Sequence, residues 1–140
     1  MITEMKPDLD KSLEQLENEI WKEPSYDSHL VKTIYALRKK PLGLFTPEDL
    51  RIVIGQNFSL EYLIPIAIEK LQENILSEGN LYPGDLLNNV LNADVSFWRK
   101  NKKEWEITRS LVENNKYLLM PESEYRAIIK SFEKFEQINK

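Results

Sequence analysis

The segment Lys40–Leu91 constrains the fold most, because helix start signals and apolar helix faces follow one another along it with only short turns between them. Thr46–Asp49 has the residues of a helix start, with a capping threonine, a proline suited to the first helical position and two acids that favour the positive helix end. Ser59 is placed to cap a longer helix that reaches about Asn74. Apolar residues occupy most sides of that helix, which predicts a central position in the fold.

Apolar residues spaced three and four apart predict further helices on both sides of this segment. The expected helices cover residues 9–20, 28–40 (capped by Asp27 or Ser28), 47–55 (ended by a left-handed Gly55), 85–91 (capped by Asp85), 94–112 and 122–138. For residues 116–120 the sequence does not decide between a loop and a short extended piece. We expect one all-α domain over residues 1–140, with residues 1–8 loosely ordered. It should be a compact multi-helix bundle of about seven helices with no significant β-sheet.

Composition narrows the class of protein. The chain has no cysteine, which excludes disulfides and thiolate metal sites and fits a reducing compartment. The amino-terminal residues lack the basic start and apolar core of a signal peptide, and no apolar run is long enough to span a membrane. We therefore expect a cytoplasmic protein that binds no membrane. The net charge of -4 repels phosphate backbones and favours a basic protein partner.

Residues suited to bond chemistry are scarce. The single histidine, His29, lies near Ser25 and Ser28, but no nucleophile elbow or oxyanion-hole motif accompanies these serines. No zinc or calcium motif is present. The carboxylate pairs are explained by helix starts and solvated helix faces. The sequence therefore predicts no enzyme, no catalytic residue, no cofactor and no metal site.

The basic run Arg99–Lys103 lies between Trp98 and Trp105 and allows two interpretations. Interleaved aromatic and cationic side chains can hold single-stranded nucleic acid. Tryptophans seven residues apart also share one helix face, which would turn them inward and leave the cations in water. The second interpretation is favoured, and no nucleic acid is expected as a partner.

A set of short motifs resembles the helical immunity proteins of bacterial contact-dependent growth inhibition (CDI) systems. The motifs are KKPL at 39–42, FTPEDLRIVIGQ at 45–56, LIPIAIEKLQENIL at 63–76, LYPGDLL at 81–87 and FW at 97–98. The resemblance extends from Leu13 to Trp98, and the last 40 residues match less distinctly. It implies a bacterial protein that binds and neutralises the C-terminal toxin domain of a cognate CDI exoprotein.

The toxin is expected to be a nuclease, with an RNase favoured, and to form a 1:1 complex with a monomer of this chain. Nuclease sites are basic, so acidic helix faces are the expected toxin interface. The residues expected there are Glu14, Glu17, Glu48, Asp49 and Asp85. Alternatives are a non-inhibitory helical interaction module or a subunit of a larger assembly, a small enzyme of unknown type, and a nucleic-acid binder that uses Arg99–Lys103.

Overall fold

The computed structural model describes residues 8–25 and 28–140, and within them the chain forms nine α-helices and two short 3₁₀ helices. The elements are α1 (Leu13–Glu17), α2 (His29–Leu37), η1 (Leu42–Leu44), α3 (Pro47–Gly55), α4 (Leu60–Glu73), α5 (Asp85–Leu91), α6 (Val95–Lys100), α7 (Lys102–Asn114), α8 (Lys116–Leu119), η2 (Ser123–Tyr125) and α9 (Arg126–Gln137). Only an isolated antiparallel bridge between Glu78 and Pro83 has β geometry in this part of the chain. The expected all-α fold is confirmed.

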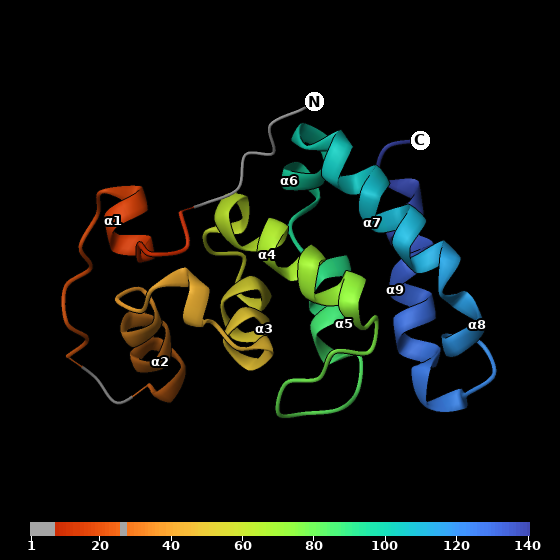
Figure 1. Ribbon diagram of the computed structural model, residues 1–140, viewed down its shortest axis with the longest axis horizontal. Helices are drawn as coiled ribbons and strands as arrows, with labels where there is room; N and C mark the ends of the chain where they lie inside the picture. The colour runs from red at the N-terminus through yellow and green to blue at the C-terminus, as the bar shows by residue number, and fades with distance from the viewer. Residues whose placement is uncertain (1–7, 26–27) are drawn as a thin grey trace.

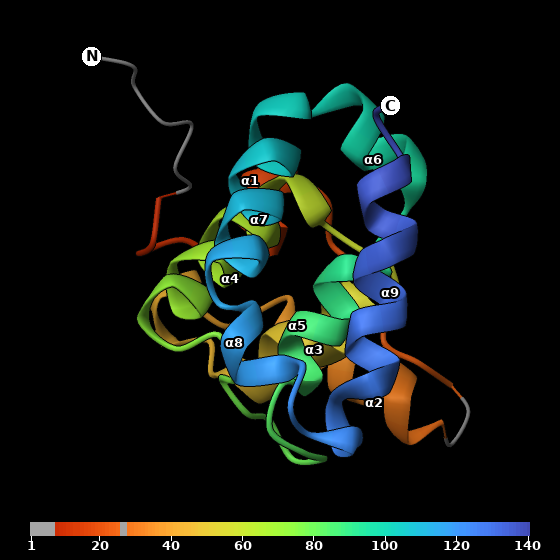
Figure 2. The same cartoon turned by 90° about the vertical axis from the view of Figure 1, so that its right-hand side faces the viewer.

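The central helix is α4, as its apolar residues predict. All seven of its buried residues are apolar, and it contacts α3, α5 and α7. In Figure 1, α1 and α2 lie at one end of the molecule, α3, α4 and α5 in the middle, and α7, α8 and α9 at the other end. Figure 2 shows α7 and α9 side by side, in agreement with the contacts between them.

Capping residues in the sequence correctly predicted where several helices begin. Thr46 and Asp49 form a capping box at α3, with Pro47 in its first turn. The Ser28 hydroxyl accepts a hydrogen bond from the Val31 N–H at the start of α2, whereas the alternative cap, Asp27, lies outside the described residues. Loose order was expected for residues 1–8, of which residues 1–7 lie outside the described part of the chain.

Other expectations were wrong in detail. The first helix is shorter than predicted, and Leu9 and Ile20 are exposed rather than part of an apolar face. The left-handed residue after α3 is Asn57 and not Gly55. Residues 116–119 form the short helix α8, so neither a loop nor an extended piece is correct there. Asn101 divides the expected helix over 94–112 into α6 and α7.

An aromatic cluster joins the last helices to the core. The Phe135 ring of α9 lies 5.0 Å from Trp98 and 5.8 Å from Trp105, measured between ring centroids. The Trp105 indole N–H donates to the Phe135 carbonyl oxygen over 2.9 Å. Both tryptophans are buried, while Arg99, Lys100, Lys102 and Lys103 are exposed, as the inward-facing interpretation predicts.

Candidate functional site

The acidic residues of α1 are paired with the end of α2. Lys39 Nζ lies 2.8 Å from a Glu14 carboxylate oxygen, and this hydrogen bond raises the pKa of Lys39. The Arg38 guanidinium binds the Glu17 carboxylate and donates to the Glu19 carbonyl oxygen over 2.8 Å. Glu14 and Glu17 therefore attach α1 to α2.

Arg38 is the buried cation of this contact, with only 2% of its surface exposed. Its guanidinium also lies over the Trp21 ring, 4.5 Å from the ring centroid. The Ser59 hydroxyl donates to Glu17 over 2.8 Å, so Ser59 stands at the start of α4 without capping it through its side chain. Glu17 thus links α1, α2 and the start of α4. It also supplies the negative partner of the buried Arg38, whose charge would be costly to bury without one.

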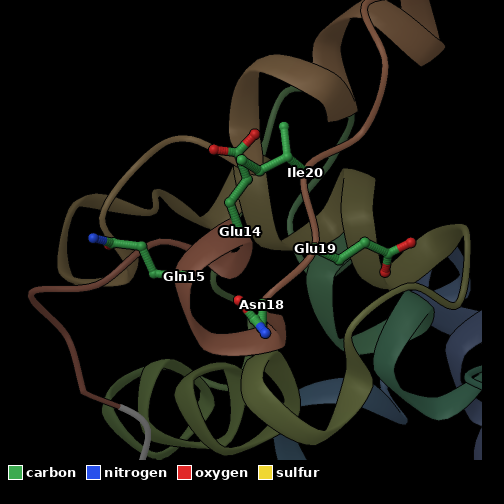
Figure 3. Close-up of a pocket in the computed structure, with 5 residues that line it drawn as sticks. All are labelled: Glu14, Gln15, Asn18, Glu19 and Ile20. Atoms are coloured by element: carbon green, nitrogen blue, oxygen red, sulfur yellow. The ribbon is translucent and has the colours of Figure 1, made fainter.

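A shallow hollow of about 380 Å³ lies on the outer side of α1. Its lining is Glu14, Gln15, Asn18, Glu19 and Ile20. Figure 3 shows the Glu14 and Ile20 side chains next to each other, while Gln15 and Glu19 point away to opposite sides. The hollow is open to solvent, and its lining holds the carboxylates of Glu14 and Glu19 beside the apolar Ile20.

Another ion pair lies at the start of α3. The Asp49 carboxylate is 2.6 Å from Lys40 Nζ, and it accepts the Thr46 N–H over 3.0 Å as half of the capping box. Consecutive cations at the end of α2 therefore each bind one of the expected interface acids: Arg38 binds Glu17, Lys39 binds Glu14 and Lys40 binds Asp49.

Glu48, Arg51 and Asp85 form a third group, between α3 and α5. Arg51 donates to both Glu48 carboxylate oxygens, over 2.7 and 2.6 Å. Its Nε also lies 3.8 Å from the Asp85 carboxylate. The Asp85 side chain is only 1% exposed, so Arg51 balances a charge that water does not reach.

The two carboxylates of this group hold the loop before α5. Asp85 accepts the N–H groups of Gly79 (2.7 Å), Leu81 (3.0 Å) and Tyr82 (3.4 Å). Glu48 accepts the remaining one, from Asn80, over 2.7 Å. Four consecutive backbone donors thus point inward to fixed acceptors, and the loop does not depend on water for these bonds.

Glycines allow this loop to pack closely. Gly84, the N-cap of α5, has φ +90°, which disfavours any side chain. A Cβ atom there would lie 2.6 Å from the Ile128 Cδ1 of α9. A Cβ atom at Gly79 would lie 3.1 Å from the Glu48 Cα. Asp85 is the first residue of α5, and its side chain bonds the loop instead of capping the helix as predicted.

The Glu48 contacts predict a dependence of stability on pH. The Arg51 hydrogen bonds, together with the Asn80 N–H, lower the pKa of Glu48 below its ordinary value of 4.5. Its stabilising contribution is then complete above pH 4.5 and is lost as the pH falls through the folded-state pKa. We expect wild type to be more stable than Glu48→Gln at neutral pH. The difference in free energy of unfolding, measured by urea unfolding at a series of pH values, should narrow as the pH falls from 4.5 through the folded-state pKa of Glu48. A difference that stays constant into strong acid would contradict the assignment.

The five expected interface acids therefore differ in accessibility. Four keep a partly exposed side chain, with exposed fractions of 16% for Glu14, 21% for Glu17, 19% for Glu48 and 16% for Asp49. Asp85 is buried and cannot present its carboxylate to a partner. Sequence reasoning missed Arg51 and the exposed loop residues Leu81 and Tyr82. The LYPGD motif indicated a turn. It could not indicate that Leu81 and Tyr82 are exposed, because their exposure depends on contacts between residues distant in sequence.

Catalytic and metal chemistry find no support among the described residues. His29 is exposed in the first turn of α2. No group of three or more potential metal ligands is found in the part of the chain that the structure describes. Within these same residues, none of the helices combines the length and the apolar composition that a membrane span requires.

Comparison with known proteins gives one match. A family model described as CDI immunity proteins matches residues 15–107, about two thirds of the chain. The matched range contains α2 to α6 and the carboxylate-held loop, and it ends within α7. No curated protein and no solved structure matches the chain.

Proposed function

Because the chain belongs to the family of CDI immunity proteins, we propose that it binds the C-terminal toxin domain of a cognate CDI exoprotein and neutralises it. The family match over residues 15–107 carries this proposal. The complex is 1:1 and forms in the cytoplasm of the bacterium that makes both proteins. The chain acts by binding and not by catalysis, and it needs no cofactor, nucleic acid or membrane.

The proposed target is a nuclease, with an RNase favoured, whose active site or substrate surface the chain covers. The net charge of -4 supports this choice, because a surface that binds nucleic acid is basic. Glu14, Glu17, Glu48 and Asp49 are proposed to contribute from partly exposed positions. Arg38, Lys39 and Lys40 bind Glu17, Glu14 and Asp49, respectively. Glu48 binds Arg51 and accepts the Asn80 N–H of the loop. The buried Asp85 is proposed to contribute indirectly, by holding the N–H groups of the loop at Gly79, Leu81 and Tyr82.

The direct test combines binding and protection. The full chain is titrated with the toxin domain encoded immediately upstream, and toxin activity is measured in the same samples. We expect nanomolar binding with loss of activity, and survival of cells that express the toxin only when the chain is co-expressed. Absence of binding, or binding that leaves the toxin active, would contradict the proposal and favour a non-inhibitory interaction module.

Charge reversal tests the electrostatic part. We expect Glu14→Lys to lower the association rate constant several-fold at low salt, with little change in the dissociation rate, because a rim charge acts mainly on encounter. The rates are measured by surface plasmon resonance at several salt concentrations. Glu133→Lys on α9 is the matched control, since it changes the net charge equally at an exposed site on another helix. Equal effects of the two variants would exclude a specific role for Glu14.

A further inference from the structure

The loop before α5 presents two apolar side chains to solvent. Leu81 is 62% exposed and Tyr82 is 38% exposed, and they are neighbours in a short loop closed by the bridge between Glu78 and Pro83. The closure is continued by a hydrogen bond from the Gly84 N–H to the Leu76 carbonyl oxygen, over 3.1 Å. Exposed apolar side chains at a closed loop indicate a contact surface when they are held in place.

These two side chains are held in place from below. The N–H groups of both residues bond the buried Asp85 carboxylate, and that carboxylate is balanced by Arg51. The Tyr82 hydroxyl also accepts a hydrogen bond from the Asn88 side chain over 3.2 Å. A loop fixed before binding loses little conformational entropy on binding, so its contacts contribute more to affinity than those of a flexible loop. This network requires the Asp85 charge to be buried, which costs free energy. A loop that only connected two helices would not need such a network.

Acidic side chains surround this loop. Glu78 belongs to the loop itself, and Glu122 and Glu124 lie in the connection that leads into α9; all three are exposed. In both Figures 1 and 2 the loop and this connection lie along the lower edge of the molecule. The end of the loop packs against α9, because a Cβ atom at Gly84 would lie 2.6 Å from the Ile128 Cδ1. Burial raises the pKa of the Tyr125 hydroxyl, and the charges of Glu124, Glu122 and Glu78 raise it further.

We propose that Leu81 and Tyr82, with Glu78, Glu122 and Glu124 around them, form a preorganised docking surface for a basic face of the toxin domain. This loop surface rests on the proposed function and states where the partner binds. The acids complement a basic partner and speed its encounter, and the two apolar side chains enter its surface and slow its release. The pattern, an apolar centre with a charged rim, is the usual anatomy of a specific protein interface.

Matched alanine substitutions test the loop surface. Leu81→Ala and Tyr82→Ala are compared with Leu30→Ala and Tyr117→Ala, which remove the same side chains at sites 40% and 70% exposed in α2 and α8. All four sites are on the surface, so the variants should fold, which circular dichroism and urea unfolding check. We expect each loop variant to raise the Kd for the toxin domain at least about tenfold, as hot-spot residues do. The two controls should change it less than about twofold, as most interface-distant residues do.

The outcomes separate this inference from the proposed function. If wild type binds and inhibits the toxin while both loop variants bind within twofold of wild type, the docking surface is wrong and the immunity function stands. If Tyr117→Ala weakens binding instead, the partner docks at α8 and the inference is overturned. A dimer of the free chain that Leu81→Ala dissociates would assign the loop to self-association and overturn it too. If wild type does not bind the toxin at all, the proposed function and the inference fail together.

Salt dependence tests the acidic rim separately. The triple variant Glu78→Gln, Glu122→Gln and Glu124→Gln should flatten the dependence of the association rate on ionic strength while the dissociation rate changes little. An unchanged salt dependence would show that the partner face at the loop is not basic, and would overturn that part of the proposal.

Discussion

We expect Phe135→Ala to lower the free energy of unfolding by about 3–5 kcal/mol, the range for removing a buried aromatic side chain. Phe135 is buried, packs edge-on against Trp98, and stacks on Trp105 and Phe132. Its ring therefore joins α6, α7 and α9, and no small shift of one helix can fill the space it would leave. The position lies beyond the residues 15–107 that match the family, so a loss of this size would show that α9 is part of the same stable unit.

The measurement is urea unfolding followed by both tryptophan fluorescence and far-ultraviolet circular dichroism. Phe58→Ala is the matched control, because Phe58 is an exposed phenylalanine with one edge-on contact to Trp21, and we expect it to cost about 1 kcal/mol or less. One transition seen identically by both probes would support the predicted single domain. Two transitions, with Phe135→Ala affecting only one, would contradict it.

Asp85→Asn should lower the free energy of unfolding by about 2–4 kcal/mol, although it preserves the shape of the side chain. The asparagine oxygen can still accept the hydrogen bonds on one side, but the NH₂ group would then face either the donors of Leu81 and Tyr82 or that of Gly79. Arg51 would lose one of its two negative partners in the same step. The size of the effect comes from burial, because the Asp85 side chain is only 1% exposed and cannot exchange the lost bonds for bonds to water.

Urea unfolding measures the loss, and hydrogen exchange locates it. In wild type we expect slow exchange of the amides of residues 79–82, and Asp85→Asn should release these amides before the rest of the protein. Asp10→Asn is the matched control, since it makes the same change at an exposed aspartate and should alter stability by less than about 0.5 kcal/mol. Rapid exchange at residues 79–82 in wild type would contradict a preorganised loop.

Sequence reasoning succeeded where the deciding interactions are local. The capping box of Thr46 and Asp49 spans three residues, and the apolar residues of α4 determine that the helix must be buried on most sides. It was less accurate at α1, where the spacing of Leu9, Leu13, Leu16 and Ile20 fits a helix but only five residues form one. Leu9 and Ile20 are 49% and 77% exposed, so burial does not reward a helix that would extend to them.

The candidate site was predicted only in its chemistry. The acids at 14, 17, 48, 49 and 85 are where the sequence places them, but each has a partner outside its own helix: Arg38 is 21 residues from Glu17, and Asn80 is 32 residues from Glu48. The sequence identified Asp85 as an important acid and assigned it to a helix cap. Its contacts with the loop N–H groups depend on how the chain turns at Gly79 and Gly84, where close packing against α3 and α9 allows no side chain.

The sequence by itself determined that the chain is all-α, where most of its helices lie, and to which family it belongs, because caps, helical periodicity and motifs act over a few neighbouring residues. Only the tertiary structure decided which charges are paired, that Asp85 is buried, and that Leu81 and Tyr82 are exposed on a fixed loop. Burial and ion pairing depend on which surfaces meet after the helices pack, and residues far apart in sequence supply those surfaces.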